Sequence, residues 1–224
     1  MNGCPLNVLG RGDNWIAVDK PAGLSTISPP GGDSLEQRLR VQMPEASYLT
    51  AVHRLDRPVS GVVLVALSKR AARLLSVQFE TRKVRKRYHA RLTGRWEGER
   101  AVWEDHLIKR PGEARADVVT AEASQAKRAV TEVMFDRYDA ASAETSVWLS
   151  PLTGRMHQLR IQAARRGHPI VGDLLYGGES SGEVDSTDQT FRIALRAREL
   201  TFFDPRNGRR TTITAPADGD AETR

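Results

Sequence analysis

Hydrophobic residues in this chain more often alternate with polar residues over short stretches than repeat with a helical period. Apolar stretches at residues 15–19 and 61–67 predict buried strands, and the first runs into the turn-forming segment Lys20-Pro21-Ala22-Gly23. Shorter patterns predict further strands at residues 88–92, 130–135, 145–149, 191–195 and 211–214. Strands are therefore expected to outnumber helices.

Helical periodicity is confined to three segments. Ser34 and Gln37 have the spacing of a capping box, and Ser68 is placed to cap the second segment. Gly167 follows the third segment and favours its termination there. The predicted helices cover residues 35–43, 69–80 and 153–166.

Two stretches show no periodicity and are predicted to be loops, residues 109–125 and 177–189, and the tail at residues 217–224 is expected to fray. The sequence contains no internal repeat and no hinge-like linker. Because strands and helices are interspersed, we expect a single domain over residues 1–224. Its predicted fold class is α/β of the α+β type, with a central mixed, mainly antiparallel sheet and flanking helices.

Composition narrows the classes of protein. The chain has 224 residues, 39% of them hydrophobic, which is enough for a folded core. Its net charge of +6 favours polyanionic partners. The longest apolar run, residues 62–67, is far shorter than the ~20 residues of a membrane helix. With one cysteine, Cys4, no Cys/His cluster and no signal-like start, we expect a cytoplasmic protein without internal disulfide or metal site.

One acidic residue stands among basic groups in the run His53-Arg54-Leu55-Asp56-Arg57-Pro58-Val59-Ser60-Gly61. Neighbouring cations favour the ionised form of a carboxylate, and this suits a nucleophile or a general base. The alternative is a surface turn with a salt-bridged aspartate, and the run alone does not separate the two.

A second segment about a hundred residues downstream changes this balance. It is Thr153-Gly154-Arg155-Met156-His157-Gln158-Leu159-Arg160, followed by Gly167-His168-Pro169-Ile170 and Gly172-Asp173. With the segment at Lys20, the Asp56 run and the basic strand around Tyr88, it resembles the RluA-like pseudouridine synthases. The matches follow the family's order from about residue 15 to residue 216, and they imply the pseudouridine synthase catalytic-domain fold.

The resemblance implies an isomerase that converts uridine to pseudouridine in structured RNA, either ribosomal or transfer RNA. The bond from the ribose to the uracil ring nitrogen is broken, and the ribose is rejoined to a ring carbon. This reaction needs no metal and no cofactor. Asp56 is the implied catalytic residue, as nucleophile or as base. The target base would be flipped out of its stack, and the protein is expected to act as a monomer.

Other motif positions carry implied roles. Tyr88 would lie against the target base, Arg160 would pair with the Asp56 carboxylate, and Leu159 would form an apolar wall of the pocket. Arg54 would hold or replace the flipped nucleotide, or contact a phosphate. Residues 81–95 hold seven Lys and Arg and no acid, which favours phosphate contacts. Further substrate or RNA contacts are expected from Lys20, His53, Arg85, Arg87, Arg155 and His157.

The sequence departs from the family pattern at Pro58-Val59, Met156, Gln162 and Arg196, and these changes bear on the choice of RNA. Only about twenty residues precede the first motif, so we expect no S4-like domain, and RNA selection by the catalytic domain itself. Two alternatives stay open: a non-catalytic RNA-binding protein on the same fold, and a basic hydrolase acting on RNA. The first would not need Asp56, Tyr88 and Arg160 together. The second would use Asp56 as a general base and would typically need a histidine or a second carboxylate as its partner.

Overall fold

The computed structural model describes residues 5–29, 32–177 and 192–217. Contacts divide the chain into two compact units, residues 1–86 with 197–224 (unit 1) and residues 87–196 (unit 2). Cys4, the predicted loop beyond Gly177, Phe191 and the predicted tail beyond Ala217 lie outside the described residues.

Unit 1 is built on a sheet with the strand order β1-β2-β4-β10. These strands are β1 (Asn7–Arg11), β2 (Trp15–Lys20), β4 (Ser60–Ala66) and β10 (Leu195–Phe203), with β3 (Thr50–Ala51) paired to β4 and β11 (Arg210–Thr214) paired to β10. The pairs β1–β2, β2–β4, β3–β4 and β10–β11 are antiparallel. The apolar runs of β2 and β4 are buried along almost their whole length, as central strands require.

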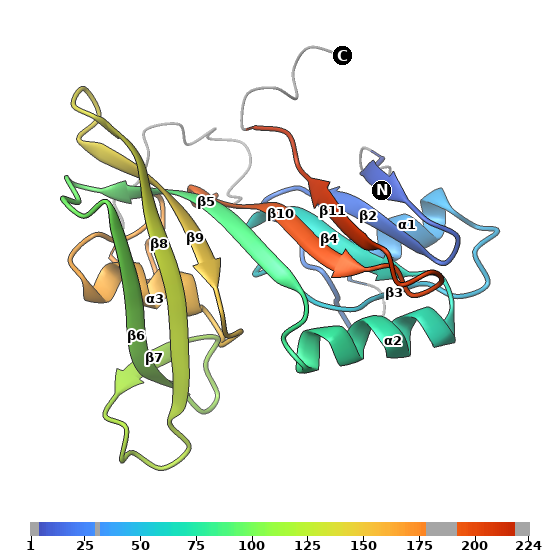
Figure 1. Cartoon of the computed structure of the whole chain (residues 1–224), viewed down its shortest axis with the longest axis horizontal. Helices are drawn as coiled ribbons and strands as arrows, with labels where there is room; N and C mark the ends of the chain where they lie inside the picture. The colour runs from blue at the N-terminus through green and yellow to red at the C-terminus, as the bar shows by residue number, and fades with distance from the viewer. Residues whose placement is uncertain (1–4, 30–31, 178–191, 218–224) are drawn as a thin grey trace. The chain divides into compact units, whose positions relative to one another are not determined.

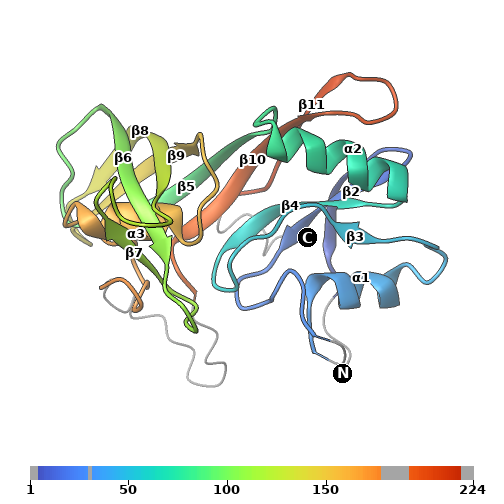
Figure 2. The same cartoon turned by 90° about the horizontal axis from the view of Figure 1, so that it is seen from below.

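Two helices cover the sheet of unit 1, one on each face (Figure 2). Both begin at serines whose hydroxyls accept a backbone N–H bond, Ser34 before α1 (Leu35–Gln42) and Ser68 before α2 (Lys69–Glu80). On the inner side of α2, Ala71 and Leu75 pack into a core with Trp15, Leu64 and Phe202. This core supports the strand that leads out of the Asp56 motif.

Unit 2 is built on an antiparallel sheet with the strand order β5-β9-β8-β6-β7 (Figure 1). Its helix α3 (Gln158–Arg165) packs on one sheet face, where Ile161 meets Leu107, Ala116 and Ala129. The strands are β5 (Arg85–Thr93), β6 (Arg100–Lys109), β7 (Ala116–Val119), β8 (Lys127–Asp139) and β9 (Glu144–Pro151).

The structure confirms the α+β class and most predicted elements, and it corrects three of them. The strand predicted at residues 191–195 is wrong, because residues 192–194 are in no strand and β10 runs from Leu195 to Phe203. The stretch at residues 109–125 is not a loop throughout, because it contains β7, a short edge strand with little apolar alternation. The third helix begins at Gln158 rather than at residue 153, because His157 has a left-handed backbone (φ 52°) that helical residues do not adopt. The strands β1, β3 and β6 were not predicted, since their buried positions are too few.

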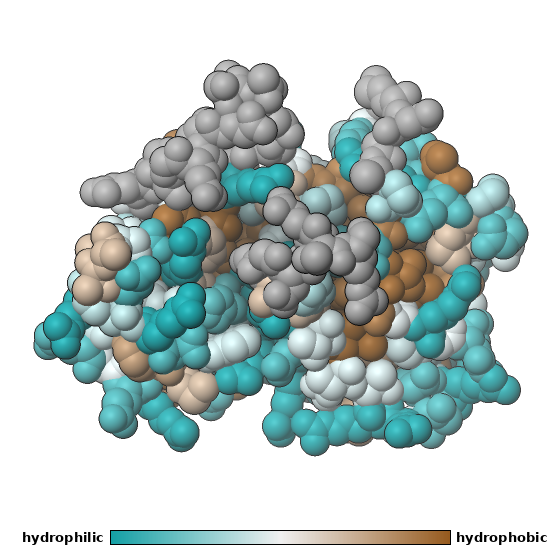
Figure 3. Space-filling model, turned by 90° about the horizontal axis from the view of Figure 1, so that it is seen from above, coloured by the Kyte–Doolittle hydropathy of each residue, from teal (hydrophilic) through white to brown (hydrophobic). Residues whose placement is uncertain are grey.

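Large hydrophobic side chains are also found on the surface, and Figure 3 shows hydrophobic areas between hydrophilic ones. The more exposed of them come from several elements and include Ile27, Val41, Val102, Leu152 and Leu174. Within the described ranges, no helix is both long enough and apolar enough to cross a membrane.

Candidate active site

Asp56 stands on a tight turn between β3 and β4. The Val59 N–H donates to the Asp56 carbonyl at 3.0 Å and closes the turn. On either side, Leu55 and Val59 are 5% and 3% exposed, so both flanks are anchored in the core while Asp56 stays partly exposed. The departure Pro58-Val59 fits this turn, since Pro58 stiffens it and Val59 fills an apolar position. The motif therefore places one carboxylate at a fixed point on the surface.

The loop after β2 holds the Asp56 turn from the other side. The Gly23 N–H donates to the Arg57 carbonyl at 2.8 Å, and the Arg57 Nε donates back to the Gly23 carbonyl at 2.8 Å. The Thr26 hydroxyl donates to the Leu55 carbonyl at 3.1 Å and accepts from the Leu55 N–H at 3.2 Å. Two motifs thirty residues apart in sequence thus form one rigid substructure around Asp56.

Lys20 lies beneath this substructure and is fully buried. Its ammonium donates to the carbonyls of Leu24, Pro21 and Arg57 at 2.7, 2.9 and 3.2 Å. Burial lowers the pKa of Lys20 to about 8, and the Asp56 carboxylate opposes this shift. The placement favours a structural and electrostatic role for Lys20 over a direct contact with RNA, because its three amino hydrogens are directed to the protein backbone.

His53 also faces inward. Its Nε2 accepts the Leu64 N–H at 3.0 Å, and its ring stacks on Phe79 with centroids 4.7 Å apart. Burial, assisted by the charge of Lys86, lowers the pKa of His53 to about 3. The ring is therefore neutral at pH 7 with its proton on Nδ1, and it ties the Asp56 motif to β4 rather than contacting phosphate as a cation.

The neutral, half-buried ring of His53 makes folding sensitive to acid. The pKa falls from 6.5 to about 3 on folding, so the unfolded chain binds this proton first as the pH drops. We expect the stability advantage of wild type over His53→Gln to shrink by roughly 2–3 kcal/mol between pH 7 and pH 4. Urea unfolding of both proteins across this range measures it. A stability difference that does not change with pH would contradict a neutral His53 ring in the folded protein.

A steric constraint requires glycine at the last position of the Asp56 motif. Gly61 has φ +114°, and a Cβ at this position would lie 2.1 Å from the Ala197 carbonyl oxygen. Only glycine combines this backbone conformation with so close an approach. Arg54, in contrast, is exposed and so available at the surface, and its contact with a nucleotide or a phosphate stays a prediction.

In unit 2, alternation along β5 separates the predicted site residues. Tyr88 is 9% exposed and lies on the buried face with Ala90 and Leu92. Arg85, Arg87 and the other odd-numbered residues of the strand lie on the opposite, more open face. The basic run is therefore not one uniform surface, and the arginines within β5 do not share a face with Tyr88.

Leu159 and Arg160 lie in the first turn of α3 and are 7% and 5% exposed. The guanidinium of Arg160 forms a two-pronged ion pair with Asp173, from Nε at 2.6 Å and from Nη2 at 2.7 Å. Asp173 is itself 1% exposed. Asp173 lies in a matched motif, but the sequence analysis did not identify it as the partner of Arg160. The pairing of Arg160 with Asp56 stays a prediction.

His157, at which the third predicted helix is interrupted, is also held by contacts. The His157 Nδ1 lies 3.0 Å from the Tyr176 hydroxyl, and that hydroxyl accepts the Ala116 N–H at 2.9 Å. The Arg160 guanidinium lies 5.2 Å from the centre of the Tyr176 ring. Arg155 is partly exposed, and its Nε donates to the Arg128 carbonyl at 3.1 Å. His157 therefore joins the start of α3 to β7.

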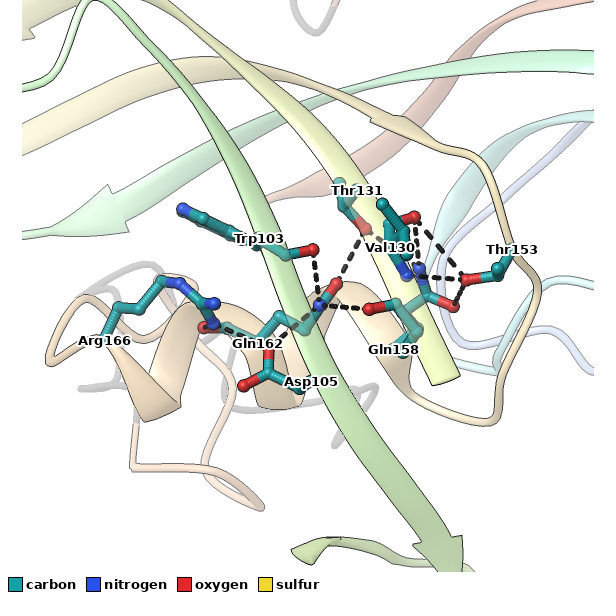
Figure 4. A network of polar contacts seen from close by, with 9 residues as sticks. Trp103, Asp105, Val130, Thr131, Thr153, Gln158, Gln162 and Arg166 are labelled. Atoms are coloured by element: carbon teal, nitrogen blue, oxygen red, sulfur yellow. Dashed lines mark hydrogen bonds and ion pairs between the residues drawn. The ribbon is translucent and has the colours of Figure 1, made fainter. Parts of the chain in front are cut away.

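A buried polar network holds α3 against β6 and β8 (Figure 4). The Gln158 side chain accepts from Thr153 at 2.7 Å and donates to Thr131 at 2.9 Å. One turn later, Gln162 accepts from Thr131 at 2.7 Å and donates to Asp105 at 2.9 Å and to two strand carbonyls. The departure at Gln162 is therefore structural, and the network fixes the helix that carries Leu159 and Arg160.

This network predicts a stability effect for Gln162→Leu. The substitution keeps the size of the side chain but leaves buried partners on β6 and β8 without hydrogen bonds, which we expect to cost about 3 kcal/mol. Chemical denaturation measures the loss. The matched control is Gln37→Leu at an exposed position of α1, with an expected change below about 0.5 kcal/mol. Equal effects of both changes would show that the network does not stabilise the fold.

Comparison with known proteins identifies the family. The family model described as RNA pseudouridylate synthase matches residues 14–165. The dual-specificity RNA pseudouridine synthase RluA of Escherichia coli (strain K12) is 36% identical over 219 residues, covering 95% of this chain and 94% of that protein. The ribosomal large subunit pseudouridine synthase C of Haemophilus ducreyi is 32% identical over 222 residues, covering 97% of this chain and 67% of that protein.

Comparison with solved structures supports the same family assignment. The human RNA pseudouridylate synthase domain containing 1 superposes with a TM-score of 0.78 at 29% identity, covering 97% of this chain and 86% of that one. The human RNA pseudouridylate synthase domain containing 4, at 23% identity and a TM-score of 0.73, shares the fold. With a family model over most of the chain and relatives that cover nearly all of it, this protein belongs to the RNA pseudouridylate synthase family, as an isomerase that converts uridine in RNA to pseudouridine.

Proposed function

We propose that this enzyme isomerises specific uridines in structured ribosomal or transfer RNA, with Asp56 as its catalytic carboxylate. The observation that carries the proposal is the rigid turn of Asp56, which two motif segments hold through reciprocal hydrogen bonds between Gly23 and Arg57 and between Thr26 and Leu55. A nucleophile or base that must meet one atom of a bound nucleotide benefits from such preorganisation.

The chemistry places defined demands on the carboxylate. The bond between the ribose carbon and the uracil nitrogen breaks, the base turns, and a new bond forms from the ribose to a ring carbon that then loses its proton. A carboxylate can begin this sequence as a nucleophile or as a base. Lys20 lies beneath the turn, and the charge of Asp56 raises the pKa of its ammonium against the larger lowering by burial, so the two groups interact electrostatically.

Tyr88, Leu159 and Arg160 are proposed to serve the same reaction. Their assignment rests on the motif matches, and their burial within unit 2 is that of constrained side chains rather than of a solvated surface. Tyr88 would stack on the flipped uracil and Leu159 would exclude water from it. The buried charge of Arg160 would support the anionic groups of the reaction.

Substrate choice is proposed from the relatives. One of them is named a ribosomal large subunit enzyme and another a dual-specificity enzyme, so both ribosomal and transfer RNA are candidate substrates. The net charge of +6 supports binding to either. We further propose that the protein acts on cytoplasmic RNA as a monomer, which light scattering of the purified enzyme would check.

Mapping of pseudouridines in total RNA, from cells with and without the gene, tests the proposed function. We expect one or a few uridines to lose the modification in the deletion strain, and to regain it when wild-type protein is supplied. Protein carrying Asp56→Asn should not restore them. An unchanged pseudouridine map would argue for the non-catalytic alternative, and strand cleavage would argue for the hydrolase.

A further inference from the structure

Unit 2 has a cavity on the sheet face that points away from Tyr88. Strands β5, β6, β8 and β9 form its floor, and its volume is about 590 Å³. This is within the range of small-ligand sites and is sufficient for one nucleotide. The principal lining side chains are Arg87, Arg100, Val102, Glu132, Met134 and Trp148.

The best-defined feature of the cavity is an arginine stacked on an indole. The Arg87 guanidinium lies 4.1 Å from the centre of the Trp148 ring. The Trp148 N–H donates to Asp136 at 3.3 Å, and the ring of His89 meets the indole edge-on at 5.0 Å. The indole is therefore held in one orientation before any ligand arrives, which reduces the entropic cost of stacking a further planar group.

The other lining residues define what that planar group can be. Met134 and Val102 offer apolar surface, and Val102 is 63% exposed although it lies in a strand. Arg87 and Arg100 bring two guanidinium groups to the cavity, and these bind phosphate well. Glu132 is exposed on the same face and can accept hydrogen bonds from an amino group. An aromatic and guanidinium surface with nearby phosphate-binding groups is typical of sites for unpaired nucleotides.

We propose that this cavity binds one unpaired nucleotide of the substrate RNA, other than the uridine that is modified. The inference rests on the proposed function for the identity of the RNA. The two nucleotides must differ, because Arg87 and Tyr88 are neighbours in β5 and point to opposite faces of the sheet. The cavity thus adds a contact that anchors the RNA at a distance from the reacting base.

Glu132 gives the cavity a base preference. Its carboxylate accepts hydrogen bonds from the exocyclic amino groups of cytosine, adenine or guanine, whereas uracil has no such group. A carboxylate also disfavours a phosphate directly above it, so the phosphates belong at the two arginines. The bound nucleotide is therefore expected to carry an amino-bearing base.

Binding of short RNA without turnover tests the cavity independently of catalysis. The probes are fluorescein-labelled 12-nucleotide oligocytidylate and oligouridylate, and anisotropy at low salt gives the affinities. We expect wild type to bind oligocytidylate at least about threefold more tightly than oligouridylate. Trp148→Ala should weaken oligocytidylate binding about tenfold, in line with the loss of one stacked base. Arg87→Gln should reduce the salt slope by about 0.7, as one lost phosphate contact in single-stranded RNA requires.

Two further variants keep the result interpretable. Val102→Glu places a second carboxylate in the cavity at an exposed position, so it should weaken binding about tenfold even if Trp148→Ala does not fold. Arg209→Gln removes one positive charge from an exposed turn of unit 1 and should change affinity by less than twofold. Folding of each variant is checked by its melting curve.

The possible outcomes test the cavity proposal independently of the proposed enzymatic function. Unchanged affinity of folded Trp148→Ala and Val102→Glu would overturn the cavity proposal, even if pseudouridine mapping confirms the activity. Oligocytidylate binding that depends on Trp148 would support the cavity even if mapping finds no modified site. Loss of binding in Arg209→Gln equal to that in Arg87→Gln would also overturn it, because charge alone would then explain the affinity.

Discussion

Asp56→Asn is expected to reduce pseudouridine formation by at least about 1,000-fold while the protein stays folded and binds RNA. The amide keeps the shape of the side chain but is neither a nucleophile nor a base at neutral pH. Asp56 is partly exposed, and its turn is closed by a backbone bond that does not involve the carboxylate, so the turn should survive the substitution. Tritium release from RNA labelled at carbon 5 of uracil measures the rate.

The matched control for this change is Asp33→Asn. Asp33 is an exposed aspartate whose ion pair with Arg38 lies on the surface, so its loss should leave the rate within about twofold. Melting curves and RNA affinity are recorded for both proteins. Substantial turnover by folded Asp56→Asn would remove Asp56 from the reaction and leave the turn a structural feature.

Arg160→Leu is expected to destabilise the fold by about 3–5 kcal/mol, because it leaves the Asp173 carboxylate buried without its counter-charge. Arg160 and Asp173 are only 5% and 1% exposed, so water cannot replace the lost guanidinium. Arg160→Lys should cost less, although lysine cannot reproduce the two-pronged pairing. Chemical denaturation of the variants gives the free energies of unfolding.

A double variant separates stability from catalysis. Arg160→Met combined with Asp173→Leu removes both buried charges, and its stability should return to within about 2 kcal/mol of wild type. If Arg160 also takes part in the reaction, as its motif position implies, this stable double variant should still form pseudouridine at least about 100-fold more slowly than wild type. Recovery of both stability and rate would show that Arg160 has only a structural role.

The sequence by itself determined the elements whose signals are local. The apolar runs of β2 and β4 and the serine caps of α1 and α2 each depend on neighbours within a few residues. The family assignment was likewise available from ordered motifs, and the comparisons confirm it. Asp56 could be singled out because a lone acid in a basic motif is visible without coordinates.

Only the tertiary structure decided what the motif side chains contact. Lys20 and His53 look like cationic RNA ligands in a basic sequence. In the fold, the buried Lys20 ammonium donates to backbone carbonyls, and His53 accepts the Leu64 N–H and is neutral because its pKa is lowered. The pairing of Arg160 with Asp173 and the stack of Arg87 on Trp148 join residues that are not neighbours in the chain, 13 positions apart in the first pair. Such contacts depend on strand register and on the dielectric of the interior, and one sequence read residue by residue specifies neither.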